Sequence, residues 1–214
     1  MNYSVVIVAA GRSTRFGQAH SKILHQFSDG ERVIDKTLRP FLNDADCKQI
    51  ILVTNEEVRE YLHDSCPKTE FCPGGNSRQE SVYNGLLHAS EKYVLVHDGA
   101  RCFLYEEDLN ALKAEISDEQ GALLVKSVTD TIKIARDGYV SQTIDRDSVK
   151  RAQTPQGFPC KVLLECYRKA FKEGYLGTDD CSLVERYSDL KIKCVESKGD
   201  NIKITTFDDV NGGK

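Results

Sequence analysis

The sequence predicts an α/β fold in which a mostly parallel sheet is covered by helices on both faces, with a hairpin arm added late in the chain. Three observations predict this fold. Short apolar runs rich in valine and isoleucine alternate with helical patterns, and these runs lack the strict polar–apolar alternation of half-exposed strands. The third observation is a stretch at 127–147 that does alternate and interrupts the pattern. We therefore expect one domain over residues 1–214, with the arm at about 127–147.

Four buried strands are predicted in the first part of the chain, at 5–10, 49–54, 93–98 and 121–126. Each is an apolar run of strand length, from VVIVAA to GALLVK. Helical patterns lie between or beside them at 33–42, 56–62, 77–89 and 106–116. After the arm we expect a helix at 161–172 and two strands, at 191–196 and 202–205, that complete the sheet. Strands and helices in such repetition are typical of a parallel α/β sheet.

The arm is predicted from the dipeptide Asp137-Gly138, which lies between two alternating runs. Asp-Gly in this setting is a strong signal for a β-hairpin. An isolated two-stranded hairpin is marginally stable in water, and an insertion into an α/β sandwich has little core of its own to bury. We therefore expect the arm to pack on a partner, most simply a second copy of the chain.

Composition and charge exclude several classes of protein. The formal net charge of -4 gives no global attraction for nucleic acid. No apolar run approaches the roughly 20 residues of a membrane-spanning helix, and the first residues lack the basic region of a signal peptide. The eight cysteines are scattered without a Cys-x-x-Cys pair, which predicts reduced, mostly buried thiols and not a disulfide frame or a zinc site. We expect a cytoplasmic protein that binds neither nucleic acid nor membrane.

The loop after the first strand combines small residues with cations. The small residues are Ala9, Ala10 and Gly11, and the cations that follow are Arg12, Arg15 and Lys22. Ligands of open α/β sheets bind outside the carboxyl ends of strands, where small residues let them approach the backbone. Neither the Walker pattern nor the dinucleotide-binding glycine pattern fits the loop. A triphosphate-binding loop and a solvated connection both remain open on these residues alone.

A second motif is PGGNSRQESVYNGL, which starts a predicted helix. The pair Gly74-Gly75 permits a tight turn, and Ser77 with Glu80 fits a capping box. Arg78 and Ser81 are three residues apart and share one face of the first turn, near a helix end that favours anions. The alternative is a well-capped surface helix.

A third motif, VLVHDGARCF, ends a predicted strand in Asp98. A carboxylate at this place can hold Mg²⁺, which takes few protein carboxylates together with substrate phosphates. Arg101 could instead neutralise Asp98 in a structural ion pair.

Three further motifs lie in the second half of the chain. DRDSVKRAQTPQGF carries Arg146, Thr154 and Gln156, and DNIKITT places Lys203 on a late predicted strand. The acidic pair Asp179-Asp180 in GTDDCSLVE is interpreted as a helix cap and not as a catalytic pair.

Together these motifs resemble the 2-C-methyl-D-erythritol 4-phosphate cytidylyltransferase family of the non-mevalonate isoprenoid pathway. Seven blocks follow the family's order over almost the whole chain: AAG(x)3R(x)6K, GGxxRxxSVxxGL, LVHDxAR, TDTIK, DR(x)6QTPQxF, TDD and NIKIT. The resemblance implies a Rossmann-like three-layer sandwich of the nucleotide-diphospho-sugar transferase type. It also implies a homodimeric nucleotidyltransferase that uses CTP, Mg²⁺ and a polyol phosphate.

The implied reaction is a direct attack of the polyol phosphate oxygen on the α-phosphorus of CTP, with release of pyrophosphate. The protein then supplies positioning and charge stabilisation. The resemblance implies that Arg15 and Lys22 are catalytic, because they neutralise the α-phosphate and the leaving pyrophosphate together with Mg²⁺. Asp98 matches the family's strand-end acid and is the expected metal ligand.

The same match implies the remaining site residues. On the nucleotide side they are Ala9, Ala10, Gly11, Ser13, Gly75, Arg78 and Ser81. On the substrate-positioning side they are Arg101, Thr131, Arg146, Thr154 and Lys203. In the family, the arm residues that match Thr131 and Arg146 reach into the partner subunit's site, which agrees with the dimer expected from the hairpin.

The chain departs from the family pattern around Lys22, where Ser21 and Ile23 stand in place of the usual proline and glutamine. The nearest alternative is a cytidylyltransferase for ribitol 5-phosphate or a similar alditol phosphate, which shares the nucleotide half of the site. A second alternative is a non-catalytic nucleotide-binding regulator, and the retained cations on both substrate sides argue against it. Pyrophosphate release from CTP with each acceptor separates these functions.

Overall fold

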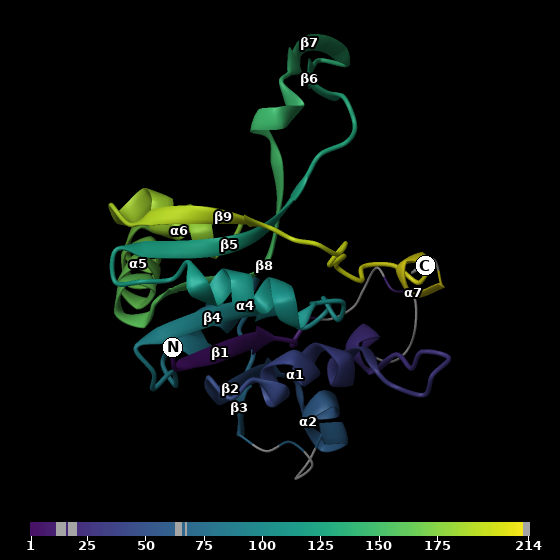
Figure 1. Cartoon of the computed structure of the whole chain (residues 1–214), viewed down its shortest axis with the longest axis vertical. Helices are drawn as coiled ribbons and strands as arrows, with labels where there is room; N and C mark the ends of the chain where they lie inside the picture. Colours follow the sequence, from purple (N-terminus) through teal and green to yellow (C-terminus); the bar gives the residue numbers. More distant parts are fainter. Residues whose placement is uncertain (12–15, 17–20, 63–65, 67, 212–214) are drawn as a thin grey trace.

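The computed structural model describes residues 1–11, 16, 21–62, 66 and 68–211. Within these residues, seven strands form one sheet in the order β3-β2-β1-β4-β8-β5-β9. The strands are β1 (Tyr3–Val8), β2 (Cys47–Thr54), β3 (Thr69–Pro73), β4 (Tyr93–Asp98), β5 (Gln120–Ser127), β8 (Lys150–Pro159) and β9 (Lys191–Glu196). Neighbouring strands are parallel except where β8 pairs with β4 and with β5. The expected mostly parallel sheet is confirmed (Figure 1).

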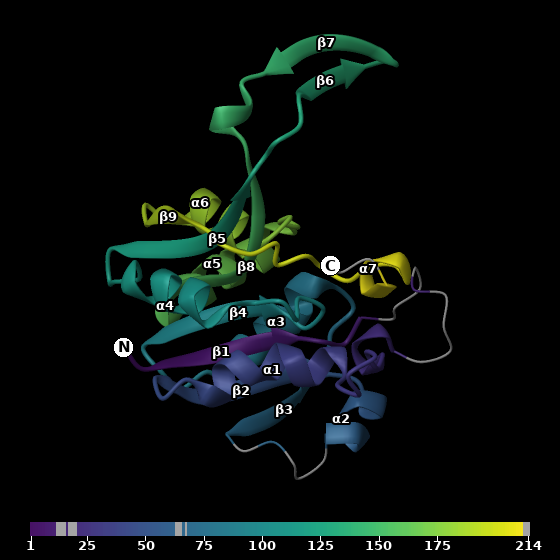
Figure 2. The ribbon, with the colours of Figure 1, turned by 45° about the vertical axis from the view of Figure 1, so that its right-hand side comes forward.

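Helices cover both faces of this sheet and produce three layers (Figure 2). One face packs against α1 (Val33–Asn43), α2 (Glu56–Leu62) and α4 (Glu106–Ala114). The other face packs against α3 (Arg78–Leu86), α5 (Cys160–Glu173) and α6 (Asp180–Tyr187). Alternate side chains of one strand serve the two cores: Val5 and Ile7 belong to the first, and Val6 belongs to the second. This double burial explains why the strand sequences show no polar–apolar alternation.

The strand order places a topological switch point between β1 and β4. The chain builds β2 and β3 outward on one side of β1 and then returns to place β4 on the other side. Val8 and Asp98, the last residues of the two strands, are register partners. The loops that follow both strands therefore open at the same edge, which is where such sheets bind ligands.

The predicted hairpin is present as β6 (Ile132–Arg136) paired antiparallel with β7 (Tyr139–Ile144). Asp137 and Gly138 have φ values of 50° and 83°, as a two-residue hairpin turn with positive φ at both positions requires. Figures 1 and 2 both show the arm projecting away from the sheet and its helices.

One predicted strand is wrong, and two strands were not predicted. Residues 202–205 form no ladder; this segment instead crosses the end of the sheet, where the amide of Ile204 donates to the carbonyl of Ala100 at 2.8 Å. The unpredicted strands are β3, which is short, and β8, whose two prolines, one glycine and two glutamines hide the apolar pattern of a strand.

All eight cysteines are free thiols in the structure, and six of them are buried, which confirms the prediction that most of them are buried. None of the helices in the described ranges is both long and apolar enough to cross a membrane. The described part of the chain ends in a short helix, α7 (Asp208–Asn211), and the ring of Phe207, just before this helix, lies 5.9 Å from the ring of Phe16.

Candidate functional site

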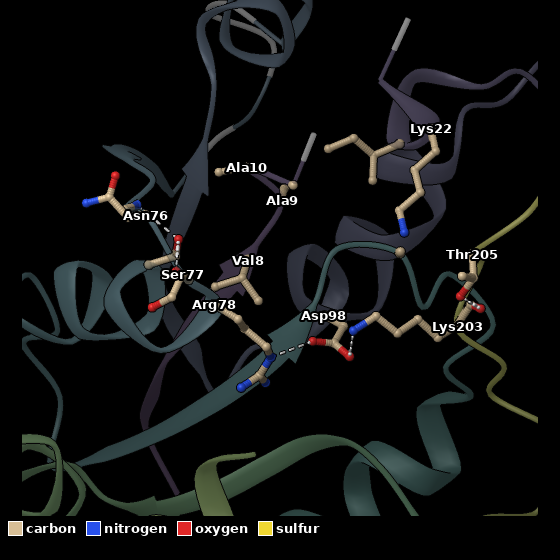
Figure 3. A pocket seen from close by; sticks show the side chains of 15 residues that line it. Val8, Ala9, Ala10, Lys22, Asn76, Ser77, Arg78, Asp98, Lys203 and Thr205 are labelled. Carbon is tan, nitrogen blue, oxygen red and sulfur yellow. Dashed lines mark hydrogen bonds and ion pairs between the residues drawn. The ribbon is translucent and has the colours of Figure 1, made fainter. Parts of the chain in front are cut away.

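A cavity of about 610 Å³ opens at the carboxyl edge of the sheet, at the switch point between β1 and β4. Val8 and Asp98 at the strand ends line it. Figure 3 shows Arg78 and Lys203 reaching Asp98 from opposite sides, while the side chain of Lys22 points into the same space. The cavity is therefore surrounded by cations, although the chain as a whole has a net charge of -4.

One wall is built from the two glycine- and alanine-rich loops. Ala9, Ala10 and Gly11 continue from β1, and Gly75 follows β3. A Cβ atom on Gly74 would collide with that of Ala10, so the absence of a side chain lets the loops approach each other. The structure thus brings together two motifs predicted to bind the nucleotide. Ser13, predicted to bind the nucleotide, and Arg15, predicted to be catalytic, lie outside the described residues.

The turn before α3 is held by hydroxyl groups. Ser77 is the N-cap and accepts the amide of Glu80 at 3.0 Å, as the sequence predicts. Ser81 Oγ accepts the amide of Gly75 at 3.0 Å and donates to the carbonyl of Ser77 at 2.9 Å. The Glu80 carboxylate accepts the amide of Asn76 at 2.7 Å, one residue earlier than in a regular capping box. Ser81 therefore fixes the turn that lines the cavity.

Asp98 is buried and faces three cations. Oδ1 lies 3.1 Å from Nε of Arg78. Oδ2 lies 3.0 Å from Nζ of Lys203 and 3.3 Å from Nε of Arg101. Burial opposes ionisation, but the three cations together hold the pKa of Asp98 well below its usual range. Arg101 therefore forms the ion pair with Asp98 that the sequence analysis gave as an alternative.

A buried hydrogen-bond chain holds the end of β4 from behind. The hydroxyl of Thr154 accepts the amide of Asp98 at 3.0 Å and lies 3.0 Å from Nδ1 of His97. Nε2 of His97 lies 3.0 Å from the carbonyl oxygen of Arg101, which can only accept, so Nε2 carries the proton and Nδ1 accepts from Thr154. Burial lowers the pKa of His97 to about 4, which keeps the ring neutral. His97 is a site residue that the sequence reasoning missed; its place inside an apolar strand was the available signal.

Arg78 has a second carboxylate partner that the sequence did not reveal. Its NH1 and NH2 atoms lie 3.2 and 2.8 Å from the two carboxylate oxygens of Asp180. Asp180 is fully buried and also accepts the hydroxyl of Tyr167 at 2.5 Å. The predicted cap at this place is confirmed for Asp179, which accepts the amide of Ser182 at 2.9 Å. Asp180 instead binds Arg78 of the cavity wall, from 102 residues further along the sequence.

Lys22 lies in a short 3-10 helix, η1 (Lys22–Leu24), at the opposite wall. Its Nζ donates to the carbonyl of Ile204 at 2.8 Å, so the late segment that carries Lys203 closes this side of the cavity. Ile23, which replaces the usual glutamine of the family, is buried and belongs to the same core as the buried side chains of α1. The apolar replacement therefore fits its surroundings.

The predicted arm residues lie apart from the cavity. Thr131 is exposed, and Arg146 lies in a short 3-10 helix, η3 (Arg146–Ser148), where NH1 donates to the carbonyl of Thr129 at 2.9 Å. The predicted residues that line the cavity are Ala9, Ala10, Gly11, Lys22, Gly75, Arg78, Ser81, Asp98 and Lys203. Arg101 and Thr154 hold Asp98 without lining the cavity.

The Rossmann-like sandwich and a cation-lined cavity at its switch point define a nucleotidyltransferase. The chain belongs to the family described as "IspD: 2-C-methyl-D-erythritol 4-phosphate cytidylyltransferase", whose model matches residues 3–213. The resemblance found in the sequence motifs is thereby confirmed.

Similar proteins carry the same description. The chain is 40% identical over 215 residues to 2-C-methyl-D-erythritol 4-phosphate cytidylyltransferase of Bacillus mycoides, covering 97% of this chain and 94% of that one. The corresponding protein of Bacillus velezensis is 41% identical over 217 residues, with 98% and 93% covered. The crystal structure of 4-diphosphocytidyl-2C-methyl-D-erythritol synthase from Anaerococcus prevotii superposes with a TM-score of 0.84 at 30% identity, covering 98% of this chain and 92% of that one. These names favour the methylerythritol phosphate family over an alditol phosphate cytidylyltransferase.

Proposed function

We propose that the chain transfers the CMP group of CTP to 2-C-methyl-D-erythritol 4-phosphate and releases pyrophosphate, in the non-mevalonate route to isoprenoids. The observation that carries this proposal is the group of Lys22, Arg78 and Lys203 around one cavity at the switch point, in a chain of this family. A transfer between two phosphate compounds needs cations for both, and the cavity presents them on opposite walls.

In the proposed reaction, a phosphate oxygen of the polyol phosphate attacks the α-phosphorus of CTP in line, and pyrophosphate leaves. The glycine- and alanine-rich wall accommodates the nucleotide against the backbone, while Ser81 and Arg78 orient it. Lys22, together with Arg15, stabilises the charge that develops on the transferred phosphate and the leaving pyrophosphate. Lys203 positions the attacking phosphate, while Arg101 and Thr154 hold Asp98 beside it. The protein itself supplies no nucleophile and gains its rate from positioning and charge.

The cavity fits Mg²⁺ in the way that nucleotide enzymes bind it. Mg²⁺ is commonly held by one or two carboxylates plus substrate phosphates, and Asp98 is the one carboxylate among the described lining residues. Elsewhere in the described chain, no group of three or more His, Cys, Asp or Glu side chains is placed to hold a metal ion. Asp98 would hold the ion that enters with CTP, and the ion would neutralise charge on the leaving pyrophosphate.

We further propose that the active unit is a homodimer joined through the arm. Tyr139 and Val140 on β7 are 80% and 65% exposed, so the arm presents large side chains that a partner chain would cover. Thr131 and Arg146 do not line the cavity of their own chain, and Figure 1 shows the arm projecting away from the sheet. In a dimer, the arm would bring these two residues to the partner's cavity.

We also propose that the protein works in the cytoplasm. Its eight free thiols suit a reducing compartment. Burial raises the pKa of Cys102 to about 12 and that of Cys47 to about 11, so these thiols stay protonated and packed in the core.

Pyrophosphate release from CTP and Mg²⁺ tests the function. The purified chain is offered 2-C-methyl-D-erythritol 4-phosphate and, separately, ribitol 5-phosphate. We expect turnover with the first acceptor and none with the second. Turnover with ribitol 5-phosphate alone would assign the chain to polymer precursor synthesis, and CTP binding without turnover would indicate a regulator.

A further inference from the structure

Asp180 is a fully buried carboxylate behind the cavity wall, at the first residue of α6. Its two carboxylate oxygens accept hydrogen bonds from NH1 and NH2 of Arg78, and one of these oxygens also accepts the hydroxyl of Tyr167. A buried charge is costly unless its partners satisfy it, and here three donors converge on one carboxylate. Such an arrangement exceeds what a helix cap needs, because Asp179 already supplies the cap.

The contacts of Arg78 fix the plane of its guanidinium group. A guanidinium carries five N–H donors in a rigid, planar fork. The carboxylate of Asp180 accepts hydrogen bonds from NH1 and NH2 of Arg78, at the end of the fork. The carboxylate of Asp98 accepts one from Nε at 3.1 Å. Within the described part of the chain, these three contacts leave two N–H donors for a ligand. Because Arg78 lines the cavity, the plane set by Asp180 decides where those donors point.

The electrostatics of the two helix ends require this pairing. Arg78 opens α3, where the partial positive charge of the helix disfavours a cation. Asp180 opens α6, where the same effect favours a carboxylate. Burial opposes the charge on Arg78, but Asp180 and Asp98 raise its pKa above the ordinary value. Burial and Asp180 also raise the pKa of Tyr167, so that its hydroxyl remains a donor.

We propose that Asp180 is a positioning residue for the nucleotide, which holds the guanidinium plane of Arg78 and acts on CTP only through Arg78. Tyr167 supports the same carboxylate from α5. This inference rests on the proposed function in one respect, namely that the cavity binds CTP. It connects α5 and α6, which lie on one face of the sheet, with the nucleotide wall at the sheet's edge.

A double-mutant cycle that measures CTP affinity tests whether Asp180 acts through Arg78. Asp180→Asn, Arg78→Ala and the double variant are compared with the parent chain by titration calorimetry with CTP and Mg²⁺, and each is checked for folding by thermal unfolding. Asp179→Asn is the matched control, because asparagine keeps the cap and this residue contacts Ser182 and Gln156 but not Arg78. Tyr167→Phe is the second probe should Asp180→Asn fail to fold, since it removes one hydroxyl and no charge.

We expect Asp180→Asn to weaken CTP binding about tenfold in the parent chain and by less than about twofold in the Arg78→Ala chain. Tyr167→Phe should give a smaller loss, about threefold, that also disappears when Arg78 is absent. Asp179→Asn should leave CTP affinity unchanged. Equal losses with and without Arg78, or no loss in the parent chain, would overturn the role of Asp180. Because the cycle measures binding, a lack of turnover with methylerythritol phosphate would contradict the proposed function and leave this result standing.

Discussion

Nζ of Lys203 lies 3.0 Å from Oδ2 of Asp98, which pairs a cation of the late segment with the acid at the end of β4. Arg101 shares the same oxygen at 3.3 Å but is also held by the carbonyl of Asn201 at 2.6 Å. The side chain of Lys203 is 40% exposed, against 14% for Arg101. Lys203 is therefore the more accessible of the two cations, and in the proposed reaction it exchanges the carboxylate for a substrate phosphate while Arg101 stays paired with Asp98.

This difference predicts the effect of Lys203→Met, which removes the charge and keeps most of the aliphatic stem. We expect kcat/KM for the polyol phosphate to fall about 10- to 100-fold, the range of a lost charged hydrogen bond. The affinity for CTP should change by less than about threefold, because the nucleotide wall is untouched. Arg151→Met is the matched control, since Arg151 forms an ion pair with Asp200 in which both side chains are 56% exposed. Equal losses for CTP and the acceptor would count against an acceptor-side role.

Lys22→Ala should reduce turnover far more than it weakens CTP binding. In the proposed reaction, the charge that Lys22 stabilises develops in the transition state, so we expect kcat to fall on the order of 100- to 1,000-fold. CTP affinity, measured by titration calorimetry, should fall by less than about tenfold. Lys48→Ala is the control, because Lys48 also donates to a backbone carbonyl, that of Ala45 at 2.8 Å, but near the start of β2. Parallel losses in binding and rate would remove Lys22 from the catalytic role.

His97 should make the fold sensitive to mild acid. Burial lowers its pKa to about 4, below the ordinary value of about 6.5, so the unfolded chain takes up a proton before the folded chain does. The free energy of unfolding is therefore lost as pH falls from about 6.5 toward 4, by about 2 kcal/mol between pH 7.5 and pH 5. The carboxylates with lowered pKa values, such as Asp98, lose their contribution only at lower pH. Urea unfolding of the parent chain and of His97→Gln at both pH values checks this, and the same pH dependence in the variant would show that another group is responsible.

The sequence predicted the sheet and helices well where each element carries its own pattern. The run at 94–96 in β4 is apolar because both faces of the sheet are buried, and the Asp137-Gly138 turn needs only local backbone geometry. The strand β8 escaped prediction because its pairing with β4 and β5 is set by tertiary contacts. Residues 202–205 were predicted as a strand from β-branched residues, yet this segment borders the cavity instead of a neighbouring strand.

The site was predictable where a motif lies next to a strand end. Asp98 is the last residue of its strand, and the loop after β1 follows a strand end in the same way. The pairing of Arg78 with Asp180 was not predictable, because two helix starts separated by 102 residues meet only in the folded chain. His97 and Thr154 likewise meet through the alignment of β4 with β8.

The hairpin arm predicts that two defective variants complement each other in a mixed dimer. If Thr131 and Arg146 bind substrate in the partner's cavity, each site combines Lys22 of one chain with Arg146 of the other. The Arg146→Ala and Lys22→Ala variants then remove different contributions to a site. A mixed dimer would contain one site with both changes and one site with neither. Mixing the two inactive variants, after dissociation and reassociation, should therefore restore about a quarter of the parent activity per chain, since about half of the dimers are mixed.

Adding Tyr139→Ser and Val140→Ser to both variants removes exposed apolar contacts of the arm and should weaken the dimer and abolish the recovery. Recovery that stays absent although mixed dimers form would show that each arm serves its own chain.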